Sequence, residues 1–298
     1  MVIKICETIQ SIRDEIKNRK RKDIDALVTF VPTMGYLHRG HITLVDVAKR
    51  DGQIVVVSIF VNPTQFGPTE DLAAYPRDIE NDVRLLNEAC PNAILFLPSS
   101  KEMYPSGVVN LSDATTATYV DVGSMTTVRE GIARPGHFRG VATVVTKLVN
   151  IVQPDIMYLG QKDAMQCVCL KKCFQDLNNP TRVVIVDTVR EPSGLAMSSR
   201  NSYLTESERL DASLIYRSMK EVASVYRTLS VEQLQEQLTT KITSNPKMVV
   251  EYISVANGST GSELSPSLDS IPPQSIISLA VFFNGQNRKT RLIDVLIL

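Results

Sequence analysis

The sequence lacks any hydrophobic run long enough to cross a membrane, and it has few cysteines and few histidines. Its longest nearly apolar stretches, Ile54–Val61 and Ile276–Phe283, are far shorter than the roughly 20 residues that a membrane-spanning helix requires. The segment Met1–Ile16 has no apolar core of a secretory signal, and its acidic residues argue against a transit peptide. We therefore expect a cytoplasmic protein that does not insert into membranes.

An excess of charge of either sign is also absent. The 32 Lys and Arg residues balance 32 Asp and Glu residues, so the formal net charge is zero. A protein that binds nucleic acid without sequence preference usually carries a basic surface, so we expect no nucleic-acid partner. Hydrophobic residues at 43% and charged residues at 21% are typical of a folded globular chain.

The five cysteines are an odd number and do not indicate a disulfide framework. Three of them, Cys167, Cys169 and Cys173, cluster within a stretch expected to be helical. A metal site is one interpretation of this cluster, but no fourth ligand is near it in the sequence. Buried free thiols are the favoured interpretation, since free cysteine usually acts as a small core residue.

Strand-like runs alternate with helical patterns until about residue 188, which is typical of βαβ units and a parallel sheet. We predict strands at 26–31, 53–61, 93–97, 156–159 and 182–186, and helices at 5–22, 42–50, 78–89 and 141–152. The pattern then changes to helices at 205–229 and 231–243 and strands at 248–255 and 276–283. We therefore predict two domains, an α/β domain over 1–188 and a smaller α+β domain over 189–298.

Two of the three histidines stand in the segment Met34–His41, between the first predicted strand and the next helix. A helix N-terminus presents unpaired backbone N–H groups and a partial positive charge, so it favours anions. His38 and His41 lie one helical turn apart and can both donate to one phosphate. A structural histidine pair and a zinc pair remain alternatives, although only His137 is left as a third histidine. No Walker-type phosphate loop occurs.

Other polar residues follow predicted strands, where ligands bind in parallel sheets. Asn62 and Gln65 are amides suited to a small polar substrate, or else ordinary turn residues. The segments Gly160–Asp163 and Met197–Arg200 offer phosphate donors, with solvated polar turns as the alternative. Arg134–Gly140 brings further positive charge to a helix start. Several phosphate donors at several strand ends indicate a nucleoside triphosphate.

Taken together, these motifs resemble one family. The segments PTMGYLHRGH, FVNPTQF, YPRD, RPGHFRGV, GQKD and GLAMSSRN, and the final RLID, occur in the order typical of the pantoate–β-alanine ligases (pantothenate synthetases). The resemblance implies a Rossmann-like, HxGH-type nucleotidylyltransferase domain with a smaller C-terminal lid domain. It also implies ATP-dependent condensation of pantoate with β-alanine through pantoyl adenylate, Mg²⁺ bound with the ATP, and a homodimer.

The resemblance also implies roles for individual residues. His41, His38 and Lys162 would be catalytic. Gln65, Gln166 and Asn62 would bind pantoate or β-alanine. Asp82 would lie near Mg-ATP, and no protein side chain would ligate the metal directly. The ATP-binding residues would be Met34, Gly35, Tyr36, Leu37, His38, Arg39, Gly40, His41, Gly160, Gln161, Lys162, Asp163, Val189, Met197, Ser198, Ser199 and Arg200.

Two other functions remain as alternatives. A nucleotidylyltransferase would attach a nucleotide to a phosphorylated substrate and release pyrophosphate without AMP. A nucleotide-sensing module would bind ATP without turnover. Gln65 and Gln166 favour a small substrate with carboxylate and hydroxyl groups, as the resemblance implies.

Overall fold

The computed structural model describes residues 3–68, 70–107, 118–123 and 129–298. The chain forms two compact units, each assembled from more than one segment. The first unit comprises Met1–Thr126, Arg134–Gly160 and Cys169–Val186. The second unit comprises Thr127–Ala133, Gln161–Val168 and Asp187–Leu298.

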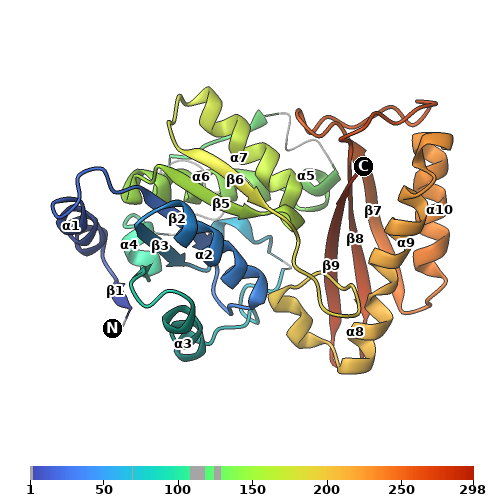
Figure 1. Ribbon diagram of the computed structural model, residues 1–298. Coiled ribbons are helices and arrows are strands. Elements are labelled where there is room, and N and C mark those ends of the chain that lie inside the picture. Colours follow the sequence, from blue (N-terminus) through green and yellow to red (C-terminus); the bar gives the residue numbers. More distant parts are fainter. Residues whose placement is uncertain (1–2, 69, 108–117, 124–128) are drawn as a thin grey trace. The chain divides into compact units, whose positions relative to one another are not determined.

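A six-stranded sheet forms the centre of the first unit (Figure 1). All of its pairings are parallel, and the strand order is β1-β4-β3-β2-β5-β6. The strands are β1 (Lys4–Cys6), β2 (Val28–Thr33), β3 (Ile54–Ile59), β4 (Ile94–Phe96), β5 (Ile156–Gly160) and β6 (Arg182–Val186). This topology confirms the predicted Rossmann-like α/β fold.

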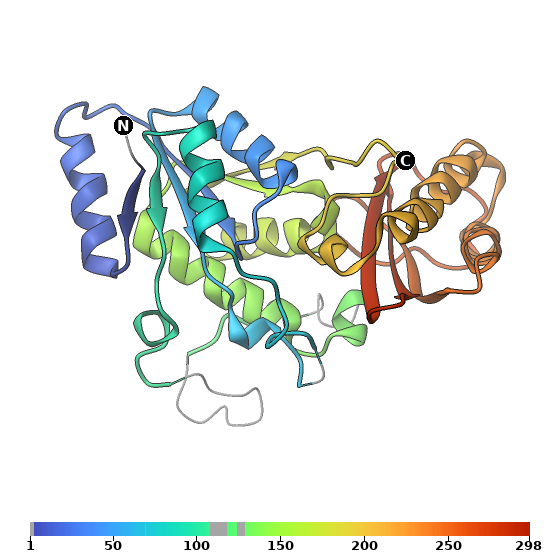
Figure 2. The same cartoon turned by 90° about the horizontal axis from the view of Figure 1, so that it is seen from below.

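Helices cover both faces of this sheet (Figures 1 and 2). The helices α2 (Arg39–Asp51) and α3 (Ile79–Ala89) pack together on one face, and α1 (Ile9–Lys20) and α6 (His137–Val152) pack together on the other. The short α4 (Ser100–Met103) follows β4, and α7 (Ala164–Asp176) connects β5 to β6. After β2 the chain adds β3 on one side of β2, and it later adds β5 on the opposite side of β2. The topological switch point therefore lies between β2 and β5. Ligands of open parallel sheets bind at such a point.

The core of this unit follows from its sequence. All six residues of β3 are buried, as expected for a run that is β-branched except for Ser58 and lies between two layers of helices. The five cysteines are free and buried, which supports the buried-thiol interpretation. Burial raises the pKa of the Cys169 thiol to about 12.

Two local predictions for the first unit were wrong. The predicted helix at 5–22 begins only at Ile9, with Thr8 as its N-cap, and the residues before it form the edge strand β1. We also expected Pro32 to end its strand, but β2 continues to Thr33. Only Thr29 and Phe30 of β2 pair with β5. Pro32 therefore lies where β2 has a single neighbour, and proline is tolerated at edges of this kind.

The second unit is built on a three-stranded antiparallel sheet of β7 (Met248–Ala256), β8 (Ile276–Asn284) and β9 (Lys289–Ile297). Apolar residues of α9 (Leu214–Ala223) and α10 (Val231–Thr243) pack with the sheet in one core. The predicted helix at 205–229 is interrupted: α8 (Glu206–Ala212) ends before α9, and a 3-10 turn, η5 (Tyr226–Thr228), follows. The Thr205–Glu208 capping box expected at its start is present. The unit also contains α5 (Arg129–Ala133) and the 3-10 helices η3 (Gln161–Asp163) and η4 (Ser199–Tyr203).

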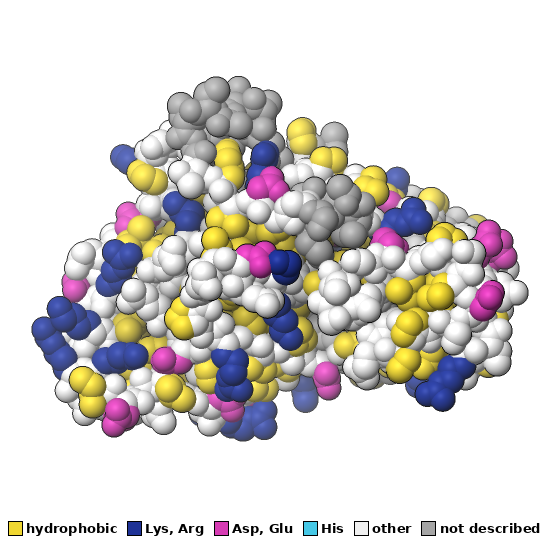
Figure 3. Space-filling model, turned by 90° about the horizontal axis from the view of Figure 1, so that it is seen from above, with side chains coloured by type: hydrophobic (Ala, Val, Ile, Leu, Met, Phe, Trp, Pro, Cys, Tyr) yellow, Lys and Arg dark blue, Asp and Glu magenta, His cyan; other side chains and the backbone are white. Residues whose placement is uncertain are grey.

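Charges of both signs are mixed on one face of the molecule. On the face shown in Figure 3, Lys and Arg side chains alternate with Asp and Glu side chains, and the described residues of this face form no extended patch of one sign. Among the described residues, no helix is both long and apolar enough to cross a membrane.

Candidate active site

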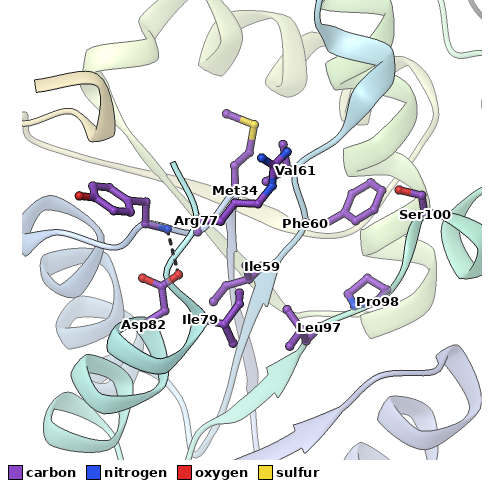
Figure 4. Close-up of a pocket in the computed structure, with 12 residues that line it drawn as sticks. Met34, Ile59, Phe60, Val61, Arg77, Ile79, Asp82, Leu97, Pro98 and Ser100 are labelled. Atoms are coloured by element: carbon purple, nitrogen blue, oxygen red, sulfur yellow. Dashed lines mark hydrogen bonds between the residues drawn. The ribbon is translucent and has the colours of Figure 1, made fainter. Parts of the chain in front are cut away.

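The loop between β2 and α2 has an unusual backbone. Gly35 and Tyr36 both have positive φ angles, of 81° and 50°. A side chain at Gly35 would meet Ile59 Cγ2 at 2.9 Å and Asp82 Oδ2 at 3.1 Å, so glycine is needed both for its conformation and for space. The Asp82 carboxylate accepts the Tyr36 N–H at 2.9 Å (Figure 4). It also accepts the Leu37 N–H at 2.6 Å. Asp82 thereby holds the loop that leads into α2.

Burial raises the pKa of Asp82, and the two backbone N–H donors offset part of this effect. Asp82 is fully buried on the first turn of α3. Its place in the structure is therefore that of a loop anchor. The suggestion that it lies near Mg-ATP stays a prediction.

The two histidines of the loop are held as a pair. Their rings lie in contact, with centroids 4.0 Å apart and planes tilted by 35°. His38 is the N-cap of α2, and its Nδ1 accepts the Gly40 N–H at 3.1 Å; the Nδ1 of His41 accepts the His38 N–H at 3.3 Å. A ring nitrogen that accepts an N–H carries no proton, so each neutral imidazole bears its proton on Nε2. The pair thus presents Nε2–H donors at a helix N-terminus, where anions are favoured.

Beside this loop lies the 3-10 helix η1 (Pro63–Gln65), which follows β3. Asn62 is 1% exposed, and its amide donates to Gln65 Oε1 at 3.1 Å and to the Gly140 carbonyl at 3.2 Å. Its Oδ1 accepts the Tyr104 hydroxyl at 2.8 Å. Since Gln65 Oε1 accepts a hydrogen bond, Gln65 presents Nε2 as a donor, and this atom lies 3.2 Å from Met34 Sδ. A thioether is a weak acceptor, so this donor is well placed to serve a ligand.

Side chains of the segment 134–140 also support Gln65, by contacting the Gln65 backbone. His137 Nδ1 lies 3.0 Å from the Gln65 carbonyl, and His137 Nε2 lies 3.0 Å from an Arg134 nitrogen. Arginine only donates, so Nε2 accepts and Nδ1–H donates to Gln65. Arg134 forms an ion pair of 2.6 Å with Glu70. Burial alone would raise the pKa of Glu70, but the hydrogen bond and charge of Arg134 outweigh burial and lower it.

Gly140 packs closely against the backbone of Thr64 and Gln65. A Cβ at Gly140 would lie 2.4 Å from the Thr64 carbonyl oxygen and 2.7 Å from Gln65 Cα. From the sequence we expected Arg134–Gly140 to add positive charge; in the structure Arg134 is paired, and the segment positions Gln65. We did not predict this role for Tyr104, Arg134, His137 and Gly140. The one sequence signal for this role was the RPGHFRGV motif, which contains Arg134, His137 and Gly140 in one continuous segment.

A cavity of about 230 Å³ lies under the Met34–Tyr36 loop (Figure 4). Its walls are mainly apolar, and the Arg77 guanidinium near it donates to the backbone carbonyls of Leu72 and Tyr75. The volume is below that of most drug-sized ligand pockets. Neither histidine of the loop lines it. Its lining residues are Met34, Gly35, Tyr36, Ile59, Phe60, Val61, Arg77, Ile79, Asp82, Leu97, Pro98 and Ser100.

The remaining predicted residues belong to the second unit, except Gly160, which ends β5. Lys162 in η3 lies 3.6 Å from Asp163, and Gln166 is half-buried near the start of α7. The Val189 carbonyl accepts the Met197 N–H at 3.0 Å, which closes a hairpin. This hairpin leads directly into Met197–Arg200, where Ser198 caps η4 through the Arg200 N–H.

The zinc interpretation finds no support in the described residues. No group of three or more His, Cys, Asp or Glu side chains among them could hold a metal ion. His137, the third histidine, contacts Arg134 and Gln65. The histidine pair is also structural in part, since it caps α2.

A doubly wound parallel sheet, with a helix N-terminus carrying donors at its switch point, defines a nucleotide-binding α/β protein of the Rossmann-like class. Comparison with known proteins specifies the family. The sequence model of the family described as pantoate–β-alanine ligase matches residues 4–297. A Dictyostelium discoideum protein named pantoate–β-alanine ligase is 47% identical over 99% of this chain and 98% of its own length. The pantothenate synthetase of Chloroflexus aggregans is 48% identical over 93% of this chain and 94% of its own.

Solved structures agree with these relatives. The pantothenate synthetase from Thermus thermophilus superposes with a TM-score of 0.84 at 39% identity, covering 99% of both chains. The Francisella tularensis pantoate–β-alanine ligase, described as complexed with beta-gamma ATP and beta-alanine, has a TM-score of 0.79 at 32% identity, covering 99% of this chain and 98% of its own. This chain therefore belongs to the pantoate–β-alanine ligase family.

Proposed function

We propose that this chain condenses pantoate with β-alanine to form pantothenate, converting ATP to AMP and pyrophosphate. A pantoate carboxylate oxygen attacks the α-phosphorus of ATP, the bond to pyrophosphate breaks, and pantoyl adenylate forms. The β-alanine amine then attacks the acyl carbon, loses a proton, and displaces AMP. Within a chain of this family, the observation that carries the proposal is the histidine pair in ring contact at the start of α2, beside the loop that bears Gln65.

The histidine pair fits the first step. A carboxylate approaching a triphosphate is repelled by its negative charge, so catalysis needs mainly positioning and neutralisation. We propose that the Nε2–H groups of His38 and His41 donate to the transferring phosphate, with His41 as the principal donor. Both rings are already held through Nδ1. Little reorganisation is then needed as negative charge develops.

Gln65 fits the acyl substrates. Its Nε2 donor is oriented by Asn62, whose own polar atoms are engaged by Gly140, Tyr104 and Gln65. We propose that this donor binds pantoate and then β-alanine, with Asn62 as the orienting residue. Gln166 is proposed as a further pantoate ligand, on the basis of the resemblance.

The nucleotide also involves residues of the second unit. We propose that Lys162 reaches the phosphates and that the Val189 backbone binds adenine. Gly160–Asp163 and Met197–Arg200 complete the contacts to ATP, with the domain 189–298 acting as a lid. A lid suits this chemistry because an acyl adenylate must be shielded from water.

Mg²⁺ is proposed to enter with ATP. The described residues offer no ready cage of carboxylates, and both Asp82 oxygens accept backbone N–H groups. This fits a metal held chiefly by substrate phosphates and water, as Mg²⁺ commonly is. The bound ion would neutralise phosphate charge. Removal of divalent ions with EDTA is expected to abolish turnover.

We also propose a cytoplasmic homodimer that binds neither nucleic acid nor membranes. The family resemblance supports the dimer, and the balanced charge supports the absence of a nucleic-acid partner. Light scattering coupled to gel filtration tests the dimer against the monomer mass of 33.0 kDa.

Pantoate-dependent exchange of labelled pyrophosphate into ATP, with Mg²⁺ and without β-alanine, tests the function. The variant His41→Asn keeps a side-chain acceptor for the His38 amide but removes the Nε2 donor. Loss of one such donor typically lowers the rate on the order of 10²–10³-fold. Thr43→Val, on the same turn of α2, removes only a hydrogen bond to the Arg39 carbonyl and serves as the matched control.

The outcomes separate the alternatives. Exchange that is lost in His41→Asn and retained in Thr43→Val supports the adenylate mechanism. Full activity of His41→Asn would refute the role given to His41. If exchange is absent, AMP formation with all three substrates is measured. Pyrophosphate release without AMP would indicate a nucleotidylyltransferase, and ATP binding without turnover would indicate a sensing module.

A further inference from the structure

The RLID motif near the chain end has no part in the proposed chemistry, yet both of its charged residues are engaged in ion pairs. Arg291 and Asp294 lie three residues apart on β9. Arg291 pairs with Glu130 of α5 at 2.7 Å, and Asp294 pairs with Arg190 at 2.6 Å. All four residues belong to the second unit. One strand therefore anchors two segments that are remote in sequence.

The Asp294–Arg190 pair is the more enclosed of the two. The Asp294 side chain is 3% exposed, and its two oxygens accept two Arg190 nitrogens, at 2.6 and 2.8 Å. Arg190 also donates to the Gly194 carbonyl at 3.1 Å, and its guanidinium lies 3.5 Å from the centre of the Tyr216 ring. A forked and stacked arginine of this kind fixes both position and orientation, which lysine cannot do.

Arg190 is part of the hairpin that leads into Met197–Arg200. The hairpin is closed by a bridge between Arg190 and Ala196 and by the Met197 N–H to the Val189 carbonyl. On the far side of the loop, Asn201 Nδ2 donates to Glu191 at 2.8 Å and to the Ala196 carbonyl at 3.0 Å. Both ends of Met197–Arg200 are thus tied to one hairpin, and Asp294 ties that hairpin to the sheet.

β9 contacts more than this hairpin. It also packs against η3, which carries Lys162, and against η4, which begins at Ser199. The strand therefore supports every element of the second unit that carries a proposed phosphate donor. A carboxylate at position 294 is the charged group through which β9 holds the hairpin.

We propose that Asp294, acting through Arg190, is a positioning residue that sets the Met197–Arg200 loop for ATP. The proposal rests on the proposed function, in which that loop contacts the nucleotide. Without the anchor the loop populates several arrangements, and ATP must order it on binding. The apparent affinity for ATP falls by the fraction of protein with the competent arrangement. The KM for ATP then rises, whereas the KM values for pantoate and β-alanine do not change.

The test compares Asp294→Asn and Arg190→Lys with Glu130→Gln. The last variant weakens the pair of Glu130 with Arg291 on the same strand, which also pairs with Glu251 and does not touch the hairpin. It therefore controls for lost stability. Steady-state KM values for all three substrates, ATP affinity by calorimetry, and thermal unfolding are measured on each full-length variant. We expect a rise in the KM for ATP on the order of tenfold in Asp294→Asn and Arg190→Lys, and no comparable change in Glu130→Gln. The double variant is expected to be no worse than the worse single one, because both changes break one contact.

Two results would overturn the proposal. One is a KM for ATP unchanged in folded Arg190→Lys and Asp294→Asn; where Asp294→Asn does not fold, Arg190→Lys decides. The other is an equal rise in Glu130→Gln, which would show that only stability matters. The variant Arg200→Ala distinguishes failure of the positioning role of Asp294 from failure of the proposed function. If Arg200→Ala also leaves the KM for ATP unchanged, the loop itself does not bind ATP, and the underlying assignment fails.

Discussion

Gly140→Ala is the substitution with the most direct structural consequence. The new methyl group would lie 2.4 Å from the Thr64 carbonyl oxygen, so backbone must move at least 0.6 Å to reach the 3.0 Å below which such contacts essentially never occur. Overpacking typically costs about 1–3 kcal/mol, and alanine regains roughly 0.5–1 kcal/mol over glycine within a helix. The two effects together span about 0–2.5 kcal/mol, and we expect a net destabilisation of about 1 kcal/mol.

The effect on activity should be larger than the effect on stability. The shift acts on η1, and the hydrogen bond from Asn62 to the Gly140 carbonyl, already 3.2 Å long, has little room to lengthen. Because a misplacement of about 1 Å can cost roughly 10²-fold in rate, kcat/KM for pantoate should fall by about that factor. Urea unfolding measures the loss of stability, and the rate of AMP formation measures the loss of kcat/KM.

Gly67→Ala is the matched control for this substitution. It lies two residues after Gln65, and its new methyl group would be 3.5 Å from a Glu70 oxygen, an ordinary contact. We expect near-normal stability and rate. A folded Gly140→Ala enzyme with normal kcat/KM would refute the argument that this contact positions Gln65.

Three further predictions concern neighbouring groups. The pKa of Glu70 is lowered from its ordinary 4.5. The stability that Glu70 gains from its pair with Arg134 is therefore full above pH 4.5 and is lost as the pH falls through the folded pKa. The difference in unfolding free energy between wild type and Glu70→Gln should shrink over that range, and a pH-independent difference would contradict this expectation. Tyr104→Phe removes the hydroxyl that donates to Asn62 at 2.8 Å and should cost about 1 kcal/mol and raise the KM for pantoate; an unchanged KM would separate Tyr104 from substrate binding. The five cysteines are free and buried, so a thiol reagent at pH 8 should modify them slowly until the protein is unfolded, and rapid labelling of the native protein would be the contrary result.

The sequence alone determined most of the α/β unit, because its signals are local. The run 54–59 is β-branched except for Ser58 and has no polar face, so it favours a strand buried on both sides. The segment Met34–His41 lies between a strand and a helical pattern, so its location at a helix N-terminus followed directly. Thr205 and Glu208 predicted their capping box because the two partners are three residues apart.

Tertiary structure decided what depends on residues far apart in the chain. The strand β1 has only three residues and exists because it pairs with β4, some 90 positions later. Asp82 has the sequence context of an ordinary first-turn carboxylate, yet it holds the backbone of Tyr36 and Leu37. Such contacts leave no periodic signal, because the partner's position is set by the fold.

For the same reason, some residues of the candidate site could be predicted from the sequence and others could not. The residues with reactive or donating side chains, His38, His41 and Gln65, were identified from their chemistry and their place after strands. The residues that hold them, His137 at the Gln65 carbonyl and Asp82 at the backbone of the histidine loop, were not identified as such. A donor can be recognised by its type and local position. A supporting residue is defined only by what it touches, and only the folded chain brings those partners together.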